Sequence, residues 1–126
     1  MANSKGFNQL ILEELNEETT VVNIRKGNLV KQGYKDFEDW SSKSNNLYIG
    51  RNMTFYVKGT NKSKWPNPYS VKKYGRDKCS EMYRKYILES KDLLNSLEEL
   101  RSKNLGCWCC PDKCHGDILI ELLEKK

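Results

Sequence analysis

The chain has 126 residues, of which 37% are hydrophobic, 31% charged and 10% aromatic. This length suits one domain and excludes a two-domain enzyme with separate cofactor and substrate lobes, while the aromatic content argues against a disordered chain. The net charge of +5 comes from one segment, because residues 51–78 carry eight basic side chains and one acidic side chain. Such a basic zone indicates either an anionic partner, such as a nucleotide or a nucleic-acid backbone, or a solvated lysine-rich loop.

No targeting or membrane segment is recognisable in the sequence. The apolar runs are too short for a transmembrane helix, and the N-terminal region turns acidic after Leu12 instead of ending in a small-residue cleavage site. Four of the five cysteines lie between Cys107 and Cys114. Because no export signal is visible, we expect a reducing, cytoplasmic location, where clustered cysteines indicate metal binding, thiolate chemistry or buried packing rather than disulfides.

In chain order, the first half of the sequence predicts a helix and then short strands. Residues 1–18 have apolar side chains at helical spacing and predict an N-terminal helical extension. The β-branched run 19–24 predicts a first strand, and residues 46–50 and 53–57 predict a second strand and a candidate third. Between the first two strands, aromatic residues spaced three apart in residues 27–46 fit a short helix or a packed loop.

The second half of the sequence predicts helices around one more strand. Residues 59–76 are rich in Gly, Asn, Lys and Pro and predict a long loop, and amphipathic patterns then predict two helices within residues 77–102. Residues 105–109 predict a buried strand, and the apolar positions of 118–123 predict a C-terminal helix. Because strands alternate with helices, we expect a single small α/β domain over residues 19–126, with a short, mostly parallel sheet covered by helices.

The densest chemical motif is Cys-Trp-Cys-Cys-Pro-Asp-Lys-Cys-His-Gly-Asp at residues 107–117. On a strand, Cys107 and Cys109 point to the same face. Cys114 and His115 lie at or just before the start of the predicted C-terminal helix. Free N–H groups and a partial positive charge at a helix N-terminus stabilise a thiolate and attract an anion.

Three interpretations of this motif stay open. In the first, it is a reactive-thiol or anion-binding active site, in which Cys114 or Cys109 is the nucleophile or acid–base group, His115 assists, and Asp117 orients the helix start or His115. In the second, the motif packs a tight contact between a strand and a helix. In the third, it is a zinc site, although the spacing is not the usual two separated cysteine pairs. The candidate zinc ligands are Cys107, Cys109, Cys114 and His115.

A second group of residues comes from strand ends and the basic loop. Ligands of a parallel sheet bind beyond the carboxyl ends of its strands, so Arg25 and Arg51, which follow two predicted strands, are expected beside the cysteine motif. The two arginines and Lys64 are candidates for holding a phosphate group. Trp65 either stacks on a base or anchors the core. Asn67, restricted by the following proline, either aims its amide inward or is an ordinary turn residue.

Taken together, these motifs resemble the domain-of-unknown-function family numbered 4326, which occurs in bacteria, phages and large DNA viruses. The family motifs V-V-N-[VI]-R, Y-I-G-R, S-K-W-G-N-P and C-W-C-x4-C-H-G-D match residues 21–25, 48–51, 63–68 and 107–117. Pro66 replaces the usual glycine, and residues 27–46 look like an insertion. The resemblance implies an α/β fold, a site at the shared motifs and, for a phage or viral protein, a location inside the host cell; it implies no particular reaction.

The sequence therefore predicts a small intracellular protein that binds or acts on a phosphate-bearing ligand, a nucleotide or nucleic acid, at a Cys/His and Arg crevice. The alternative is a noncatalytic module that binds nucleic acid or protein and whose Cys/His cluster is a structural zinc site or core packing. Zinc is the candidate cofactor, and no membrane partner is expected. Whether the protein is an enzyme stays open at this point.

Overall fold

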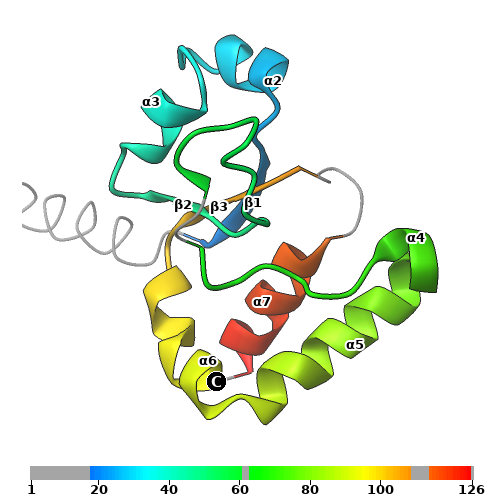
Figure 1. Ribbon diagram of the computed structural model, residues 1–126. Helices are drawn as coiled ribbons and strands as arrows, with labels where there is room; N and C mark the ends of the chain where they lie inside the picture. Colours follow the sequence, from blue (N-terminus) through cyan, green and yellow to red (C-terminus); the bar gives the residue numbers. More distant parts are fainter. Residues whose placement is uncertain (1–17, 61–62, 109–113, 126) are drawn as a thin grey trace, which may run out of the picture.

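The computed structural model describes residues 18–60, 63–108 and 114–125, and the predicted N-terminal helix and Cys109 lie outside the described residues. Figure 1 shows the elements in chain order. They are β1 (Thr20–Asn23), α2 (Lys26–Lys31), α3 (Phe37–Ser41), β2 (Asn46–Tyr48), α4 (Val71–Tyr74), α5 (Arg76–Glu89), α6 (Lys91–Ser96), the 3-10 helix η2 (Leu97–Leu100), β3 (Asn104–Cys107) and α7 (His115–Glu124).

The three strands form one parallel sheet in the order β1-β3-β2. The central strand, β3, is buried from Leu105 to Cys107, as expected of a strand with neighbours on both edges and helices on both faces. Asn23 of β1 pairs with Cys107 of β3, and Tyr48 of β2 pairs with Gly106. The carboxyl ends of all three strands therefore lie at one edge of the sheet. This arrangement confirms the predicted α/β class and its parallel sheet.

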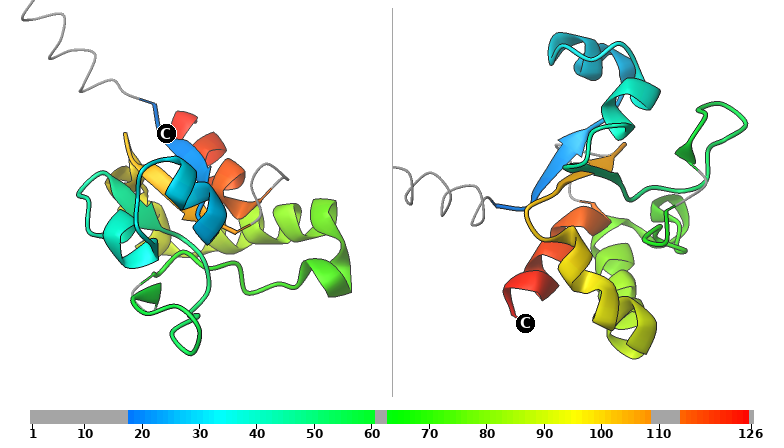
Figure 2. Two further views of the ribbon diagram at one scale, coloured as in Figure 1. Left: turned by 90° about the horizontal axis from the view of Figure 1, so that it is seen from above. Right: turned by 90° about the vertical axis from the view of Figure 1, so that its left-hand side faces the viewer.

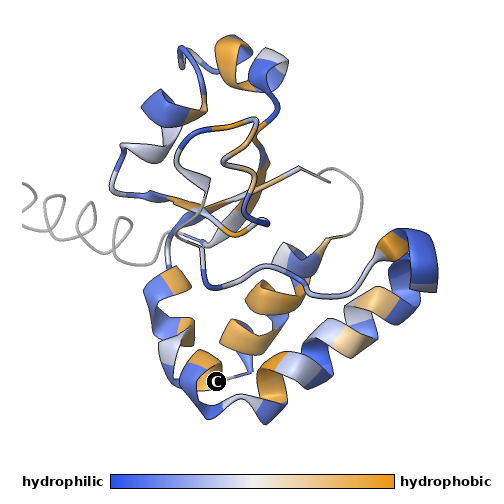
Figure 3. Cartoon of the chain, viewed as in Figure 1, coloured by the Kyte–Doolittle hydropathy of each residue, from blue (hydrophilic) through white to orange (hydrophobic). Residues whose placement is uncertain are grey.

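Helices cover both faces of the sheet (Figure 2). On one face, α7 packs against β1, α5 and η2, and it buries a hydrophobic stripe of Ile118, Leu119, Leu122 and Leu123 (Figure 3). On the other face, α2 and α3 enclose a smaller core. This second core comes from the segment that we interpreted as an insertion, residues 27–46, and from the ends of the flanking strands. Its buried side chains are Ile24, Leu29, Phe37, Trp40 and Tyr48.

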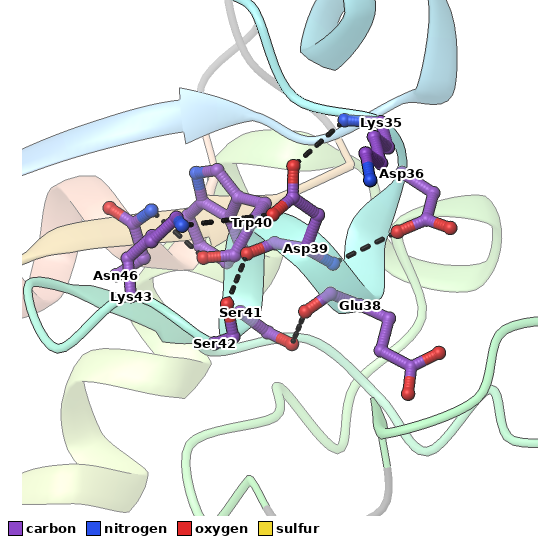
Figure 4. Close-up of polar contacts among 9 residues, drawn as sticks. All are labelled: Lys35, Asp36, Glu38, Asp39, Trp40, Ser41, Ser42, Lys43 and Asn46. Atoms are coloured by element: carbon purple, nitrogen blue, oxygen red, sulfur yellow. Dashed lines mark hydrogen bonds and ion pairs between the residues drawn. The ribbon is translucent and has the colours of Figure 1, made fainter.

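Polar contacts fix the short helix α3 at both ends (Figure 4). The Asp36 side chain accepts a hydrogen bond from the Asp39 N–H at 2.9 Å, which satisfies a donor that the first helical turn leaves exposed. Beyond the helix, the buried Asn46 side chain donates to the Trp40 carbonyl at 2.9 Å. These contacts turn the chain directly from α3 into β2 and so hold β2 against the second core.

Two local predictions are wrong. Residues 53–57 form a turn, in which the N–H groups of Tyr56 and Val57 both donate to the Met53 carbonyl, and not a strand. The residue types favour a strand, but Phe55 and Tyr56 are 94% and 82% exposed, and only Val57 packs against the second core, so the segment has no neighbouring strand among the described residues to pair with. The predicted loop 59–76 also contains a helix, because the Ser70 side chain caps α4.

No helix within the described segments is long and apolar enough to cross a membrane.

Candidate functional site

A pocket of about 330 Å³ lies beside the carboxyl ends of β2 and β3. Its wall comes from four segments that are distant in sequence: the chain after β2, the approach to α5, the end of β3 and the start of α7. Three cationic side chains line it, and no Asp or Glu is among the described lining residues. The cations are Arg51, Lys72 and Arg76.

Sulfur and imidazole groups line the same pocket. Cys79, Cys107 and Cys114 are buried thiols rather than disulfides, and His115 lies beside them. The two sulfur atoms of Cys107 and Cys114 and a ring nitrogen of His115 lie within 4.8 Å of one another. This confirms that residues of the cysteine motif come together, and the resulting group could hold a metal ion.

The order Cys-His-Gly-Asp follows from the way α7 begins. Cys114 is the N-cap: its sulfur accepts from the Gly116 N–H at 3.3 Å, and the Asp117 carboxylate accepts from the Cys114 N–H at 3.1 Å. This reciprocal pair satisfies donors that a helix start would otherwise expose. Gly116 has no room for a side chain, because an added Cβ would lie 2.9 Å from Val21 and 3.0 Å from Ile49. Asp117 therefore orients the helix start, one of its two predicted roles.

The environment of Cys114 favours its thiolate. A hydrogen bond from the Cys107 side chain lowers the pKa of Cys114, and the Gly116 N–H lowers it further, although burial opposes them. Hydrogen bonds to a charged form always stabilise that form. Cys114 therefore carries more thiolate at neutral pH than an ordinary cysteine.

His115 is held in its neutral form. Its Nε2 lies 2.7 Å from the Ile49 carbonyl oxygen, and because a carbonyl only accepts, Nε2 must carry the hydrogen. Burial lowers the pKa of His115 and the positive charge of Arg51 lowers it further, while the Ile49 carbonyl partly opposes this shift. The neutral ring therefore has its lone pair on Nδ1, where it can accept a proton or bind a metal ion.

The Tyr-Ile-Gly-Arg segment builds the part of the wall next to His115. The Tyr48 ring folds back beneath Gly50, where an added Cβ would collide with the ring. The Tyr48 hydroxyl donates to the Arg51 carbonyl at 2.6 Å and accepts from the Trp108 indole at 2.9 Å. Arg51 in turn donates from its guanidinium to the Tyr69 carbonyl at 3.2 Å. These contacts hold Arg51 on the pocket wall.

Of the predicted ligand residues in the segment 63–68, one lies at the pocket and two lie away from it. Asn67 lines the pocket, and its side chain accepts a hydrogen bond from the Tyr69 N–H at 2.9 Å. This bond shapes the turn before Tyr69, whose carbonyl holds Arg51. Trp65 is 1% exposed, and its indole donates to Glu99 at 2.9 Å. Lys64 forms an ion pair with Glu99 at 2.9 Å. The structure does not bring Lys64 and Trp65 into this pocket.

Arg25 lies at the same edge of the sheet but is not among the lining residues. Its guanidinium donates to the Trp108 carbonyl at 3.3 Å. Sequence reasoning missed Arg76 and Cys79 as parts of the site. They are three residues apart at the start of α5, a helical spacing that places both side chains toward the pocket. That spacing alone does not mark a site, because it is equally typical of a helix face that packs against the core.

Comparisons with known proteins agree with the motifs. A family model described as a domain of unknown function (DUF4326) matches residues 33–125. An uncharacterized protein of Acanthamoeba polyphaga mimivirus, a large DNA virus, is 40% identical over 87 residues, which are 62% of this chain and 66% of that relative. The chain thus spans about two thirds of the relative's length. No solved structure matches the chain.

Proposed function

Since the chain belongs to the DUF4326 family, we propose a function from the pocket itself: it binds a phosphate-bearing ligand, a nucleotide or a nucleic-acid terminus, beside the Cys107–Cys114–His115 group. One observation carries this proposal. The described wall of the pocket combines three cationic side chains with no carboxylate. A concave site of one charge sign attracts the opposite sign, because low-dielectric walls strengthen the field inside it.

The chemistry of the wall suits phosphate, because three cationic side chains can engage its several oxygens and its charge of up to about −2. The guanidinium groups of Arg51 and Arg76 can each donate two parallel hydrogen bonds to phosphate oxygens. Lys72 and Ser70 add further donors around them. The volume of about 330 Å³ is at the small end of ligand pockets, which favours a single nucleotide over a dinucleotide.

The thiol and imidazole groups extend this proposal from binding to catalysis. Cys114, with its lowered pKa, is the candidate nucleophile, and the neutral His115 is the candidate proton acceptor. Both line the pocket that carries the cations, so a bound phosphate would lie close to a thiolate. Asp117 supports this pair through the helix cap and is a positioning residue.

A zinc ion is the second candidate for the same group. The specific observation that favours it is the convergence of two sulfurs and one imidazole nitrogen within 4.8 Å. The Ile49 carbonyl also fixes the imidazole, as backbone carbonyls often do for histidines that bind metal. Cys107, Cys114 and His115 would hold the ion; Cys109, the fourth predicted ligand, lies outside the described residues. Elemental analysis decides this point: one zinc per chain supports it, and zinc-free folded protein contradicts it.

Thermal unfolding with a panel of ligands tests phosphate binding. Nucleoside mono-, di- and triphosphates should raise the melting temperature by several degrees at saturating concentration, because a ligand at about 100 times its Kd adds about 2.7 kcal/mol to the free energy of unfolding. The corresponding nucleosides, which lack phosphate, should have little effect. If no phosphate-bearing ligand stabilises the folded protein more than its phosphate-free counterpart does, the proposed function is wrong.

A further inference from the structure

Two aromatic rings project from the turn next to the pocket. Phe55 and Tyr56 are 94% and 82% exposed, and their ring centroids lie 5.7 Å apart. The turn is held by hydrogen bonds: the Met53 carbonyl accepts from the Tyr56 N–H at 2.8 Å, and the Thr60 hydroxyl accepts from the Met53 N–H at 2.7 Å. The hydrogen-bonded turn therefore presents both rings to solvent; they meet each other edge to face at an interplanar angle of 63°, and most of their surface stays exposed.

This turn lies between two pockets. Met53 lines the cationic pocket, and Tyr56 lines a second pocket of about 280 Å³. Trp108 lines both pockets, so the two adjoin at this residue. The charges of the second pocket balance, with two lysines and two acidic residues, and aromatic side chains form much of its wall. Such a wall suits the flat face of a base better than it suits a phosphate.

More positive charge continues from the cationic pocket along the corner between α4 and α5 (Figure 1). Lys72 and Arg76 line the pocket, and Lys73 and Lys78 are exposed just beside them in the sequence. The ammonium groups of Lys73 and Lys78 lie 5.1 and 5.9 Å from the centroid of the Tyr74 ring. The pocket thus has a basic ridge on one side and exposed aromatic rings on the other.

We propose that this surface binds single-stranded nucleic acid: one nucleotide enters the cationic pocket, neighbouring bases stack on Phe55 and Tyr56, and the backbone follows Lys73 and Lys78. The inference rests on the proposed function and names its ligand class. Basic side chains alternating with aromatic faces are how proteins bind single strands. A duplex does not fit this pattern, because paired and stacked bases offer no free face and a pocket for one nucleotide requires it to leave the stack.

Fluorescence anisotropy tests this inference. A labelled oligothymidylate is the single strand, its duplex with oligoadenylate is the double-stranded comparison, and thymidine monophosphate is the mononucleotide competitor. The double variant Phe55→Ala/Tyr56→Ala should bind the single strand roughly tenfold or more weakly, because each base–aromatic stack contributes appreciably to affinity. Its affinity for the mononucleotide should be unchanged. The double variant Val30→Ala/Leu88→Ala is the matched control, since it truncates two side chains that are 54% and 50% exposed elsewhere, and it should bind like the parent.

The salt dependence gives an independent readout. The slope of log affinity against log salt concentration should be shallower by about 1.4 in Lys73→Gln/Lys78→Gln, because each phosphate contact to a single strand contributes about 0.7 to the magnitude of that slope. If the oligonucleotide binds no more tightly than the mononucleotide, or if the duplex binds as tightly as the single strand, the inference is wrong and the proposed function stands. If neither mononucleotide nor oligonucleotide binds, both are wrong.

Discussion

Replacing Arg51 and Arg76 together with glutamine should weaken nucleotide binding about a hundredfold or more, because each hydrogen bond to a charged group contributes about 1.5–3 kcal/mol. Both side chains line the pocket, and Arg51 is held there by the Tyr69 carbonyl and, through its own carbonyl, by the Tyr48 hydroxyl. Glutamine keeps much of the side-chain length and polarity, so the fold should be preserved. Titration calorimetry at low salt measures the change.

The matched control removes two charges from outside the pocket. Lys64 and Arg101 form ion pairs with Glu99 and Glu98, so Lys64→Gln/Arg101→Gln changes the net charge by the same amount as the first double variant. Its nucleotide affinity should stay within about twofold of the parent, since exposed charges far from a ligand are screened. An equal loss in both double variants would show general attraction to a basic protein, and would contradict binding in this pocket.

Replacing Trp65 with alanine should lower the free energy of unfolding by about 3–5 kcal/mol, as expected for removal of a large buried aromatic side chain. Trp65 is 1% exposed and belongs to the main core. Its indole donates to Glu99 at 2.9 Å, and its carbonyl accepts from the buried Tyr83 hydroxyl at 2.7 Å. Urea unfolding followed by circular dichroism measures the loss.

Trp65→Phe separates packing from base stacking at this position. Phenylalanine keeps an aromatic ring in the core and loses the hydrogen bond to Glu99, so it should recover most of the stability that alanine loses. If Trp65→Ala lowers the free energy of unfolding by less than about 1 kcal/mol and yet loses nucleotide affinity, the indole stacks on a base and the core role is wrong. The sequence left both roles open, and burial of the side chain is the observation that favours packing.

The sheet and the cysteine motif were predictable because they depend on local patterns. The β-branched run before Arg25 and the uncharged run around Leu105 both form strands. Cys114 was expected at a helix start, and it caps α7. Parallel strands align their carboxyl ends, so the same reasoning placed Arg51 at the edge that carries His115.

The rest of the site depends on contacts between segments that are far apart in sequence. Arg76 and Cys79 reach the pocket only because α5 packs beside α7, and no local pattern reveals that packing. The turn at residues 53–57 has the composition of a strand, but a strand also needs a neighbour with which to form hydrogen bonds. The lowered pKa of His115 likewise depends on burial and on the positive charge of Arg51, which only the fold brings to the imidazole.

The most direct test of the central claim is the rate at which iodoacetamide alkylates Cys114, followed by mass spectrometry with and without saturating nucleotide. Cys114 lines the same pocket as Arg51 and Arg76, so a ligand that occupies the pocket should slow its alkylation. The protection should follow the binding curve, and it should be absent in Arg51→Gln/Arg76→Gln at the same nucleotide concentration. An alkylation rate that stays unchanged while the parent protein is saturated with nucleotide would place the ligand elsewhere and contradict the account.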